Sequence, residues 1–371
     1  MAAWGYANPV EVSFGWGALE ELPRRVGKRD AILVTFPEAK RLGVEARLEK
    51  LLGERLCDVI SDVAPLPEID WFTGRYSRSW SRFPEAVIVA VGGGSVIDTA
   101  KMLQVRTVSG RLGELKLAMV AGREPDVAAA RHVIAVPTTA GTGSEVTPWA
   151  TVWNTGSAKA PKLSLHSRYS WAECALVDPE LTVTLPPLAT RDSALDALSH
   201  ALESIWNVNA NPVSDTLAVE AARTVIATLP QLRERPADRE LRTAMARGAL
   251  MAGLAFSNTK TALAHSISYG MTLKRGLSHG LACSFTLPMV WRMAAGVDAG
   301  RDRVLARVFS EGERDPPGRL EAFLHGVGVG TRFADHGVEE GEGRRMVEAA
   351  LEGARGRNFV GRRVPAAPQP A

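Results

Sequence analysis

Nearly continuous runs of apolar, β-branched residues mark the first half of the chain, and polar or helical segments separate them. Such runs are typical of strands that are covered on both faces, as in a parallel sheet. The strands expected are 31–36 (AILVTF), 86–91 (AVIVAV), 132–139 (HVIAVPTT), 150–154 (ATVWN) and 174–179 (CALVDP). Helical patterns lie between them at 44–52 and 98–107. This alternation predicts a doubly wound α/β domain.

The pattern changes after the segment DPELTVTLPP (178–187), in which Pro186 and Pro187 interrupt regular structure. Apolar positions then recur with helical spacing, and Asn211 with Pro212 gives a turn and a helix start. The helices expected are 193–206, 212–228, 239–256 and 279–293. We therefore expect two domains, an α/β domain over residues 1–184 and an all-helical domain over residues 185–371.

Composition and charge exclude several classes of protein. The chain has 371 residues and a net charge of +3, without a concentrated basic run, which argues against a nucleic-acid partner. No apolar stretch approaches the roughly 20 residues that span a bilayer, so no membrane partner is expected. The cysteines Cys57, Cys174 and Cys283 form no CxxC pair and are interpreted as buried or incidental thiols. The N-terminus lacks a signal-peptide pattern, so the expected location is the cytoplasm.

Two polar, glycine-rich loops follow predicted strands. Gly92-Gly93-Gly94-Ser95 joins the strand at 86–91 to a helix, where backbone N–H groups can bind a nucleotide phosphate. The loop 137–145 (PTTAGTGSE) follows the next strand, and ligands bind at such strand ends in open α/β sheets. The alternatives are a tight turn that binds nothing and a capped helix start with Ser144 or Thr142 as N-cap.

Four residues of the second domain have metal-ligand chemistry. Asp196 and His200 are four apart and share a helix face, and His265 and His279 follow. Gly270 and Gly276 are expected to interrupt helical structure between His265 and His279, so that the chain can turn back. A carboxylate with three neutral imidazoles suits Fe(II) or Zn(II), although an ordinary partly buried histidine remains the alternative for His200. A phosphate-binding loop and a metal site in one chain suggest a metal-dependent redox enzyme.

At these motifs the sequence resembles the iron-dependent (group III) alcohol dehydrogenase family, from about Val12 to about Gly361. The segments that carry the resemblance are VSFGWGALEELP (12–23), GGGSVIDTAK (92–101), PTTAGTGSEVT (137–147), DPELTVTLPP (178–187), DALSHALES (196–204) and ANPVSDTLA (210–218), with the spacing of the last two histidines. The resemblance implies a nucleotide-binding α/β domain and a helical metal domain, as in the related dehydroquinate synthase-like fold.

The resemblance also implies particular residues. Asp196, His200, His265 and His279 would ligate Fe(II), or Zn(II) as in some members. NADPH or NADH would lie on Gly93, Gly94, Ser95, Asp98, Thr138, Thr139, Thr142 and Lys162.

Two departures from the family pattern bear on cofactor and proton transfer. Many members have an acidic residue after the first strand that holds the adenosine ribose, and here Phe36 stands in its place, with Lys40 and Arg41 nearby to bind a 2′-phosphate. Glu38 in the same segment leaves both NADPH and NADH open. Tyr269 stands where many members have another histidine, which argues against a histidine proton relay and leaves water as the alternative donor.

A closer resemblance, through WNVNANPVSD (206–215), HSISYG (265–270) and ARGRNFVGRR (354–363), is to the phosphonoacetaldehyde reductases of phosphonate pathways. Cations near the metal motifs would suit a phosphonate dianion. The candidates are Arg191, Lys260 and Arg275, and solvated surface charge is the alternative for each.

The sequence thus predicts a metal-dependent NAD(P)H reductase of a small carbonyl compound, phosphonoacetaldehyde or a relative such as phosphonopyruvate. Hydride would pass from the nicotinamide to a carbonyl carbon that the metal polarises. A general alcohol or aldehyde dehydrogenase, a dehydroquinate synthase-like lyase and a non-catalytic metal-stabilised binding module are the alternatives. A homodimer is a further possibility.

Overall fold

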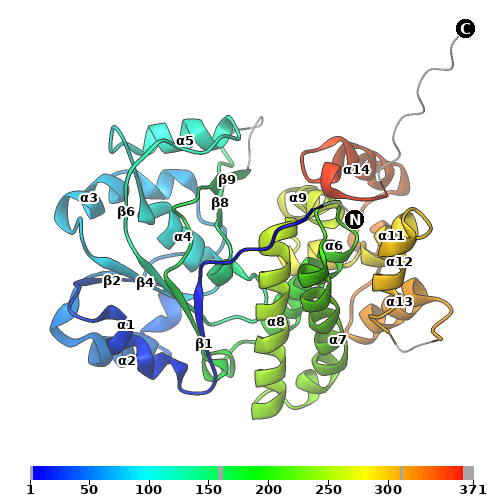
Figure 1. The fold of residues 1–371 in the computed structure, drawn as a ribbon, viewed down its shortest axis with the longest axis horizontal. Helices are drawn as coiled ribbons and strands as arrows, with labels where there is room; N and C mark the ends of the chain where they lie inside the picture. The colour runs from blue at the N-terminus through cyan, green and yellow to red at the C-terminus, as the bar shows by residue number, and fades with distance from the viewer. Residues whose placement is uncertain (1–2, 158–161, 310–311, 362–371) are drawn as a thin grey trace, which may run out of the picture. The chain divides into compact units, whose positions relative to one another are not determined.

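The computed structural model describes residues 3–157, 162–309 and 312–361 of the chain. The chain divides into two compact units, Asn8–Leu185, and Pro186–Ala371 together with Met1–Ala7 (Figure 1). The first unit is built on a parallel sheet and the second is helical, which confirms the predicted fold class.

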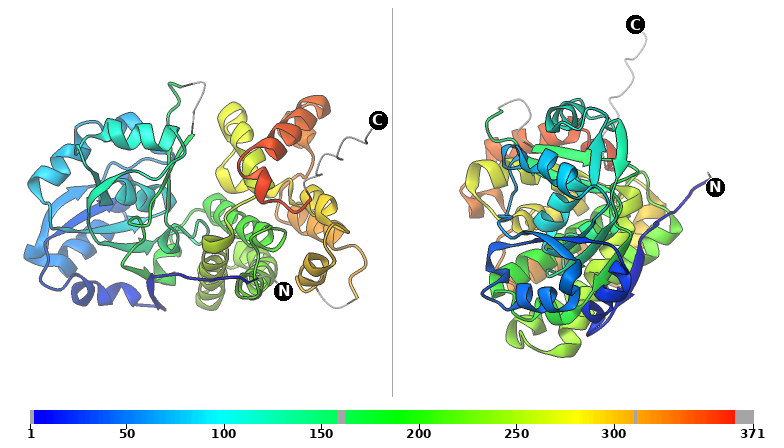
Figure 2. Two further views of the ribbon diagram at one scale, coloured as in Figure 1. Left: turned by 45° about the horizontal axis from the view of Figure 1, so that its top comes forward. Right: turned by 90° about the vertical axis from the view of Figure 1, so that its left-hand side faces the viewer.

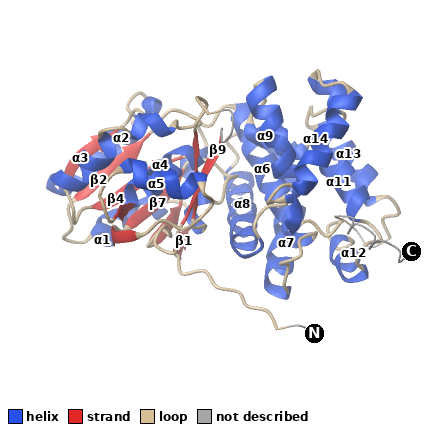
Figure 3. Cartoon of the chain, turned by 90° about the horizontal axis from the view of Figure 1, so that it is seen from above, coloured by secondary structure: helices blue, strands red, loops and turns tan. Residues whose placement is uncertain are grey.

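The first unit contains a six-stranded, all-parallel sheet of order β1-β10-β7-β4-β2-β3 (strands red in Figure 3). Its strands are β1 (Glu11–Phe14), β2 (Ala31–Thr35), β3 (Leu56–Ile60), β4 (Val87–Gly92), β7 (Val133–Pro137) and β10 (Cys174–Val177). Every residue of β2, β4, β7 and β10 is buried, as their unbroken apolar runs predict. The core of this unit therefore lies on both faces of the sheet.

Helices and two short antiparallel strand pairs complete this unit. The helices are α1 (Leu22–Val26), α2 (Val44–Leu52), α3 (Arg75–Arg82), α4 (Gly94–Gln104) and α5 (Leu112–Val120), and the antiparallel pairs are β5 (Val105–Thr107) with β6 (Val127–Ala130) and β8 (Trp149–Trp153) with β9 (Lys162–His166). The helix expected over 98–107 is wrong at its end, because α4 stops at Gln104. The Tyr76 hydroxyl donates to the Val105 carbonyl at 2.8 Å and accepts from the Thr107 N–H at 3.0 Å, which holds this β-branched segment extended.

The secondary-structure elements that the structure describes in the second unit are all helices, joined by loops (Figure 2, green to red). Its helices are α6 (Pro187–Ile205), α7 (Pro212–Glu234), α8 (Arg239–Thr259), α9 (Leu263–Arg275), α10 (His279–Ser284), α11 (Leu287–Ala294), α12 (Ala299–Leu305), α13 (Pro316–Gly326) and α14 (Glu340–Glu352). Local signals set several ends: Asn211 and Ser214 form a capping box at α7, and Asp238 caps α8. In the described part of the chain, no helix combines the length and apolar character that a membrane crossing requires.

Two expectations about this unit are wrong. Gly270 does not break the chain, since it lies inside α9 against Met346, and only Gly276 ends that helix with a left-handed φ of 68°. The helix expected over 279–293 is two helices, α10 and α11, with Phe285 and Thr286 between them.

Candidate functional site

The glycine-rich turn between β4 and α4 packs directly against the loop that follows β7. Thr138 N–H donates to the Gly92 carbonyl at 3.0 Å. A Cβ atom at Gly94 would lie 2.8 Å from Thr142 Cγ2, and one at Gly93 would lie 3.2 Å from Thr139 Cγ2. Close packing of the two loops therefore requires these glycines. It also places the hydroxyl-bearing loop beside the N-terminus of α4, where Gly93 is an N-cap without a side-chain acceptor.

Asp98 ties this region together. Its Oδ1 accepts from Ser144 Oγ at 2.5 Å and its Oδ2 accepts from the Thr151 N–H at 2.8 Å. The buried Lys101 ammonium donates to the carbonyls of Ser144 at 2.5 Å and Thr147 at 2.7 Å. The structure thus gives Asp98 internal partners on both oxygens, and its visible role is to fix the loop that follows β7.

Burial shifts the pKa of several groups in this network. It raises the pKa of Asp98 and raises that of the neighbouring buried Glu145 to about 7, while it lowers the pKa of Lys101 to about 8.

The loop that follows β7 agrees in part with the alternative of a capped helix start. Gly143, with φ 60°, is the N-cap of a short 3-10 turn, and Thr142 Oγ1 accepts from the Ser144 N–H at 3.3 Å.

The remaining two cofactor candidates lie in the same unit. Ser95 Oγ, in the first turn of α4, accepts from the Leu66 N–H at 3.3 Å. Lys162 begins β9, with its Nζ 5.5 Å from the centroid of the Trp153 ring, and its charge acts on Asp98. All eight predicted cofactor residues therefore belong to the sheet unit, and its close loop packing brings Gly93, Gly94, Thr139 and Thr142 together.

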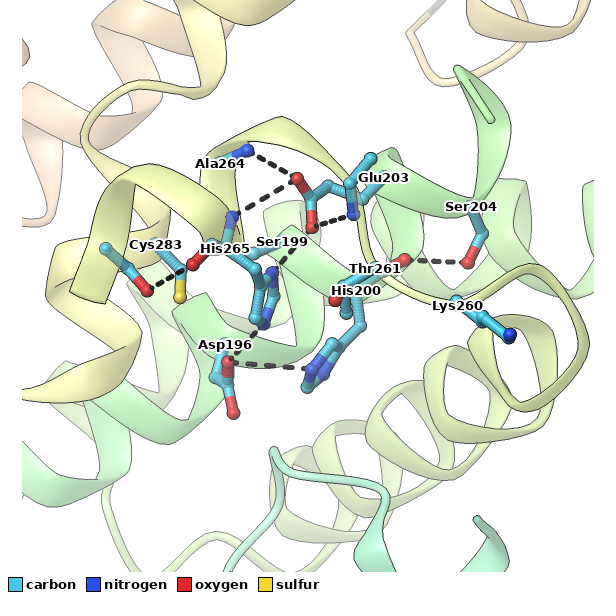
Figure 4. A network of polar contacts seen from close by, with 12 residues as sticks. Asp196, Ser199, His200, Glu203, Ser204, Lys260, Thr261, Ala264, His265 and Cys283 are labelled. Carbon is cyan, nitrogen blue, oxygen red and sulfur yellow. Dashed lines mark hydrogen bonds and ion pairs between the residues drawn. The ribbon is translucent and has the colours of Figure 1, made fainter. Parts of the chain in front are cut away.

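The four predicted metal ligands meet around one carboxylate oxygen in the helical unit, and Figure 4 labels three of them, Asp196, His200 and His265. Asp196 and His200 lie on α6, His265 on α9 and His279 at the start of α10. Asp196 Oδ1 is 3.4 Å from His265 Nε2, 3.8 Å from His200 Nε2 and 3.8 Å from His279 Nε2. Residues up to 83 positions apart thus place three imidazole nitrogens next to one oxygen.

These distances fit a metal ion. Bonds of 2.0–2.2 Å at tetrahedral angles place neighbouring ligand atoms roughly 3.3–3.6 Å apart. Asp196 Oδ1 and His265 Nε2 are buried, and neither makes a hydrogen bond within the described residues. Because an unsatisfied buried polar atom is costly, the two atoms indicate a ligand that both can bind.

Glu203, which the sequence analysis missed, orients one imidazole. It is fully buried, and its Oε2 lies 2.6 Å from His265 Nδ1. The same carboxylate accepts from the N–H groups of Ala262 at 3.0 Å and Ala264 at 2.5 Å, at the start of α9. A proton on Nδ1 leaves Nε2 with a lone pair that faces Asp196, as a metal ligand needs. The available signal was helical spacing, since Glu203 is three residues after His200.

A second missed residue, Gly280, brings α10 against α6. A Cβ atom there would lie 1.8 Å from the carbonyl oxygen of Asp192 on α6. The side chain of Asp192 also accepts from Ser278 Oγ, directly before His279. Only glycine allows this approach, and the approach places His279 beside Asp196.

Cys283, interpreted from sequence as an incidental thiol, belongs to the same cluster. It follows His279 by one helical turn, and its Sγ is 3.7 Å from His279 Nδ1. Asp196, His265, His279 and Cys283 place one ligand atom each within 4.8 Å of one another. Burial opposes ionisation of the thiol, but His265 and His279 outweigh it and lower the pKa of Cys283 to about 6.

Electrostatics act in both directions on the acid–imidazole group. Burial lowers the pKa of His265, but Cys283 and Glu203 outweigh it and raise that pKa well above its ordinary value, so an ion must displace a proton there. Burial opposes the Asp196 charge, but His200 and His279 outweigh it and hold the pKa of this carboxyl below its ordinary value. Burial lowers the pKa of His200 to about 3, so its imidazole is neutral at pH 7. The His200 ring stacks on Phe256 at 4.0 Å between centroids, which fixes its plane.

Two of the three predicted substrate cations form ion pairs, and the third is exposed. Arg191 Nε is 2.8 Å from Asp192 Oδ1, and Arg275 Nη2 is 2.9 Å from Glu342 Oε2. Lys260 is exposed and its side chain points away from Asp196 (Figure 4). Two of these charges therefore already have carboxylate partners, and the third is solvated.

Comparison with known proteins finds a family model for each half of the chain. Residues 9–179 match the family model "Iron-containing alcohol dehydrogenase", and residues 190–360 match "Fe-containing alcohol dehydrogenase family, C-terminal". Long-chain-alcohol dehydrogenase 1 of Geobacillus thermodenitrificans is 31% identical over 355 residues, with 91% of this chain and 88% of that protein covered. The chain belongs to the iron-containing alcohol dehydrogenase family. It is therefore an oxidoreductase, which confirms the expected enzyme class and disfavours the lyase and non-catalytic alternatives.

Two further relatives concern the substrate. Phosphonoacetaldehyde reductase of Streptomyces viridochromogenes is 36% identical over 217 residues, which cover 58% of this chain and 54% of that protein. The crystal structure of sulfoacetaldehyde reductase from Bifidobacterium kashiwanohense in complex with NAD⁺ superposes with a TM-score of 0.87 at 27% identity, with 97% and 95% of the two chains covered. Both names describe a two-carbon aldehyde that carries a tetrahedral oxyanion.

Proposed function

We propose that this family member is a metal-dependent NAD(P)H reductase of a small aldehyde that carries a phosphonate group, phosphonoacetaldehyde or a related phosphono-carbonyl. The metal-dependent part is supported chiefly by the convergence of three imidazole Nε2 atoms on Asp196 Oδ1, at 3.4–3.8 Å, where Asp196 Oδ1 and His265 Nε2 are buried and make no hydrogen bond within the described residues. An ion bound by both atoms would satisfy them.

In this proposal Asp196, His200, His265 and His279 hold Fe(II) or Zn(II). The ion supplies Lewis-acid polarisation of the substrate carbonyl when it is bound. Glu203 would hold the Nδ1 proton of His265 through the 2.6 Å contact and so direct Nε2 toward the ion. The packing of Phe256 on His200 keeps the second imidazole in place.

The sheet unit would bind the dinucleotide, which supplies the hydride. The first turn of α4, with Gly93, Gly94 and Ser95, offers N–H groups for the pyrophosphate. Hydroxyls of Thr138, Thr139 and Thr142 lie on the adjoining loop, and Lys162 adds a positive charge near Asp98. Asp98 itself acts as a positioning residue, since its two oxygens accept hydrogen bonds from Ser144 Oγ and the Thr151 N–H. With Phe36 in place of a ribose-binding acid, NADPH is accepted beside NADH.

The phosphonate part of the proposal is supported by the resemblance of the motifs and by the 36% identity to a phosphonoacetaldehyde reductase. The match to a sulfoacetaldehyde reductase supports the same chemical class, an aldehyde with a tetrahedral oxyanion one carbon away. A general aldehyde reductase is the competing outcome, because the family also contains the long-chain alcohol dehydrogenase.

The test is oxidation of NADPH and of NADH by protein reconstituted anaerobically with Fe(II) or with Zn(II). The substrates are phosphonoacetaldehyde, phosphonopyruvate, sulfoacetaldehyde and propanal at matched concentrations. We expect phosphonoacetaldehyde to give the highest kcat/KM, and removal of the metal by a chelator to abolish turnover. Equal kcat/KM for propanal would reject the phosphonate assignment and leave a general reductase, whereas full activity after chelation would reject the metal-dependent reaction.

A further inference from the structure

An anionic substrate needs a cation that is not already neutralised, and the residues nominated from sequence do not provide one. Arg191 and Arg275 form ion pairs with Asp192 and Glu342. Lys260 points away from the metal cluster (Figure 4). An anion bound at Arg191 or Arg275 would compete with a carboxylate that already contacts the guanidinium.

Arg355 differs from these three. It is partly buried just beyond α14, and its Cζ lies 5.0 Å from the centroid of the Tyr269 ring. Within the residues that the structure describes, its guanidinium makes no hydrogen bond or ion pair with the protein. Burial lowers the pKa of Arg355 to about 10, so the group remains charged at neutral pH without a carboxylate partner in contact.

The partner ring connects Arg355 to the metal cluster. Tyr269 follows His265 by four residues on α9, so the two side chains share one face of that helix. The Glu203 carboxylate, which contacts His265 Nδ1, also acts electrostatically on Arg355. The guanidinium is therefore linked to His265, one of the proposed metal ligands, through the Tyr269 ring and the Glu203 charge.

Long-range packing fixes the segment that carries Arg355. Asn358 Nδ2 donates to the Thr261 carbonyl at 2.9 Å, and the Asn358 carbonyl accepts from the Val208 N–H at 2.9 Å. Gly356 permits the chain to fold back on α14, since a Cβ atom there would lie 2.2 Å from the Ala350 carbonyl oxygen. The position of Arg355 is thus set by helix ends that surround the proposed metal ligands.

The cation–π contact suits an oxyanion. It uses no N–H group of Arg355, so the guanidinium fork can form two parallel bonds to a phosphonate or sulfonate. Partial burial strengthens those bonds relative to ones made by solvated side chains such as Lys260.

We propose that Arg355, which lies over the Tyr269 ring, binds the tetrahedral oxyanion of the substrate and sets the preference of the enzyme for anionic aldehydes. The proposal rests on the proposed function. The new element is the residue that would bind the phosphonate or the sulfonate.

The test compares Arg355→Met, Arg355→Lys and the control Arg357→Met, which removes an exposed cation two residues away. For Arg355→Met we expect KM for phosphonoacetaldehyde to rise about ten- to hundredfold, with kcat and the kinetics of propanal nearly unchanged. Arg355→Lys should retain part of the preference, because it keeps the charge and loses the fork. Arg357→Met should stay within about twofold of the parent.

A readout without turnover accompanies the kinetics. Binding of unreactive methylphosphonate and of methanesulfonate to the metal-loaded protein is measured by calorimetry, with metal content and Tm recorded for each variant. Loss of binding in Arg355→Met at unchanged metal content supports the proposal, and the tighter of the two anions identifies the source of the oxyanion.

The outcomes separate the two proposals. A parent enzyme that shows no preference for either anionic aldehyde over propanal rejects the anionic substrate class and the role of Arg355 with it. If the parent enzyme shows that preference and Arg355→Met retains it in full, only the role of Arg355 is rejected. Equal losses for phosphonoacetaldehyde and propanal would show a structural role, and an unfolded Arg355→Met leaves Arg355→Lys to decide by the same comparison.

Discussion

Replacement of Glu203 by Gln tests whether the helical unit is arranged around a metal ion. Glu203 accepts at Oε2 from His265 Nδ1 and the Ala262 N–H, and at Oε1 from the Ala264 N–H. A glutamine has one acceptor oxygen. If that oxygen keeps the Ala264 bond, the amide NH₂ faces His265 Nδ1, and the imidazole must move its proton to Nε2. That proton then occupies the lone pair that faces Asp196.

The magnitude follows from the chemistry of such partners. Loss of a carboxylate that orients a metal-binding histidine weakens metal affinity by about 10–100-fold, which is about 1.4–2.7 kcal/mol. The hydrogen bond that disappears has a charged acceptor, for which about 1.5–3 kcal/mol is typical. The two estimates agree, so we expect a loss of one to two orders of magnitude in affinity.

The assay is competition for Zn(II) between the protein and a chromogenic chelator at fixed pH. The matched control is Ser199→Ala, which removes a buried hydroxyl of the same helix whose bond goes only to the Leu195 carbonyl at 2.8 Å. A folded Glu203→Gln protein with a Kd for Zn(II) within twofold of the parent would refute the reasoning. An equal loss in Ser199→Ala would assign the effect to α6 as a whole.

Three further outcomes follow from the site. Gly280→Ala should reduce retained metal at least about tenfold, because its Cβ atom would lie 1.8 Å from the Asp192 carbonyl oxygen and would displace His279, whereas Gly326→Ala, with open space around it, should retain metal after dialysis. Glu145→Gln should flatten the pH dependence of the unfolding free energy. The folded pKa of Glu145, about 7, lies above the unfolded value, so the unfolding free energy of the parent falls by up to about 3 kcal/mol as pH rises from 4.5 to 7. An equal slope in the variant would contradict this. Phe36→Asp should shift kcat/KM toward NADH by restoring a ribose acceptor and repelling a 2′-phosphate; a parent enzyme that used only NADH would refute that interpretation.

The sequence by itself determined much of the sheet and the long helices. Unbroken apolar runs predicted the parallel strands β2, β4, β7 and β10, because both faces of such strands are buried, whereas the strand expected at 150–154 pairs with β9 outside that sheet. Capping signals such as Asn211 with Pro212 placed helix starts at single residues. Asp196 with His200, four residues apart, and the two later histidines were sufficient to nominate a metal site, since their chemistry does not depend on the fold.

Local signals failed where a distant side chain decided the conformation. Residues 105–107 follow a helix and have no breaker, and the hydroxyl of Tyr76 holds them as a strand. Gly270 is a breaker by type, yet Met346 packs on it inside α9. In both cases a contact between residues far apart in the chain outweighed local propensity.

Only the tertiary structure revealed which residues support the site. Glu203 and Arg355 lie in segments that carry the family resemblance and Gly280 follows His279, but the sequence assigned none of them a role. Each matters through a partner: the His265 ring, the Tyr269 ring and the Asp192 carbonyl. The structure also shows that Arg191 and Arg275 already contact carboxylates, Asp192 and Glu342. The sequence states which groups can react, whereas packing decides which of them lie close together and which charges remain free to bind a substrate.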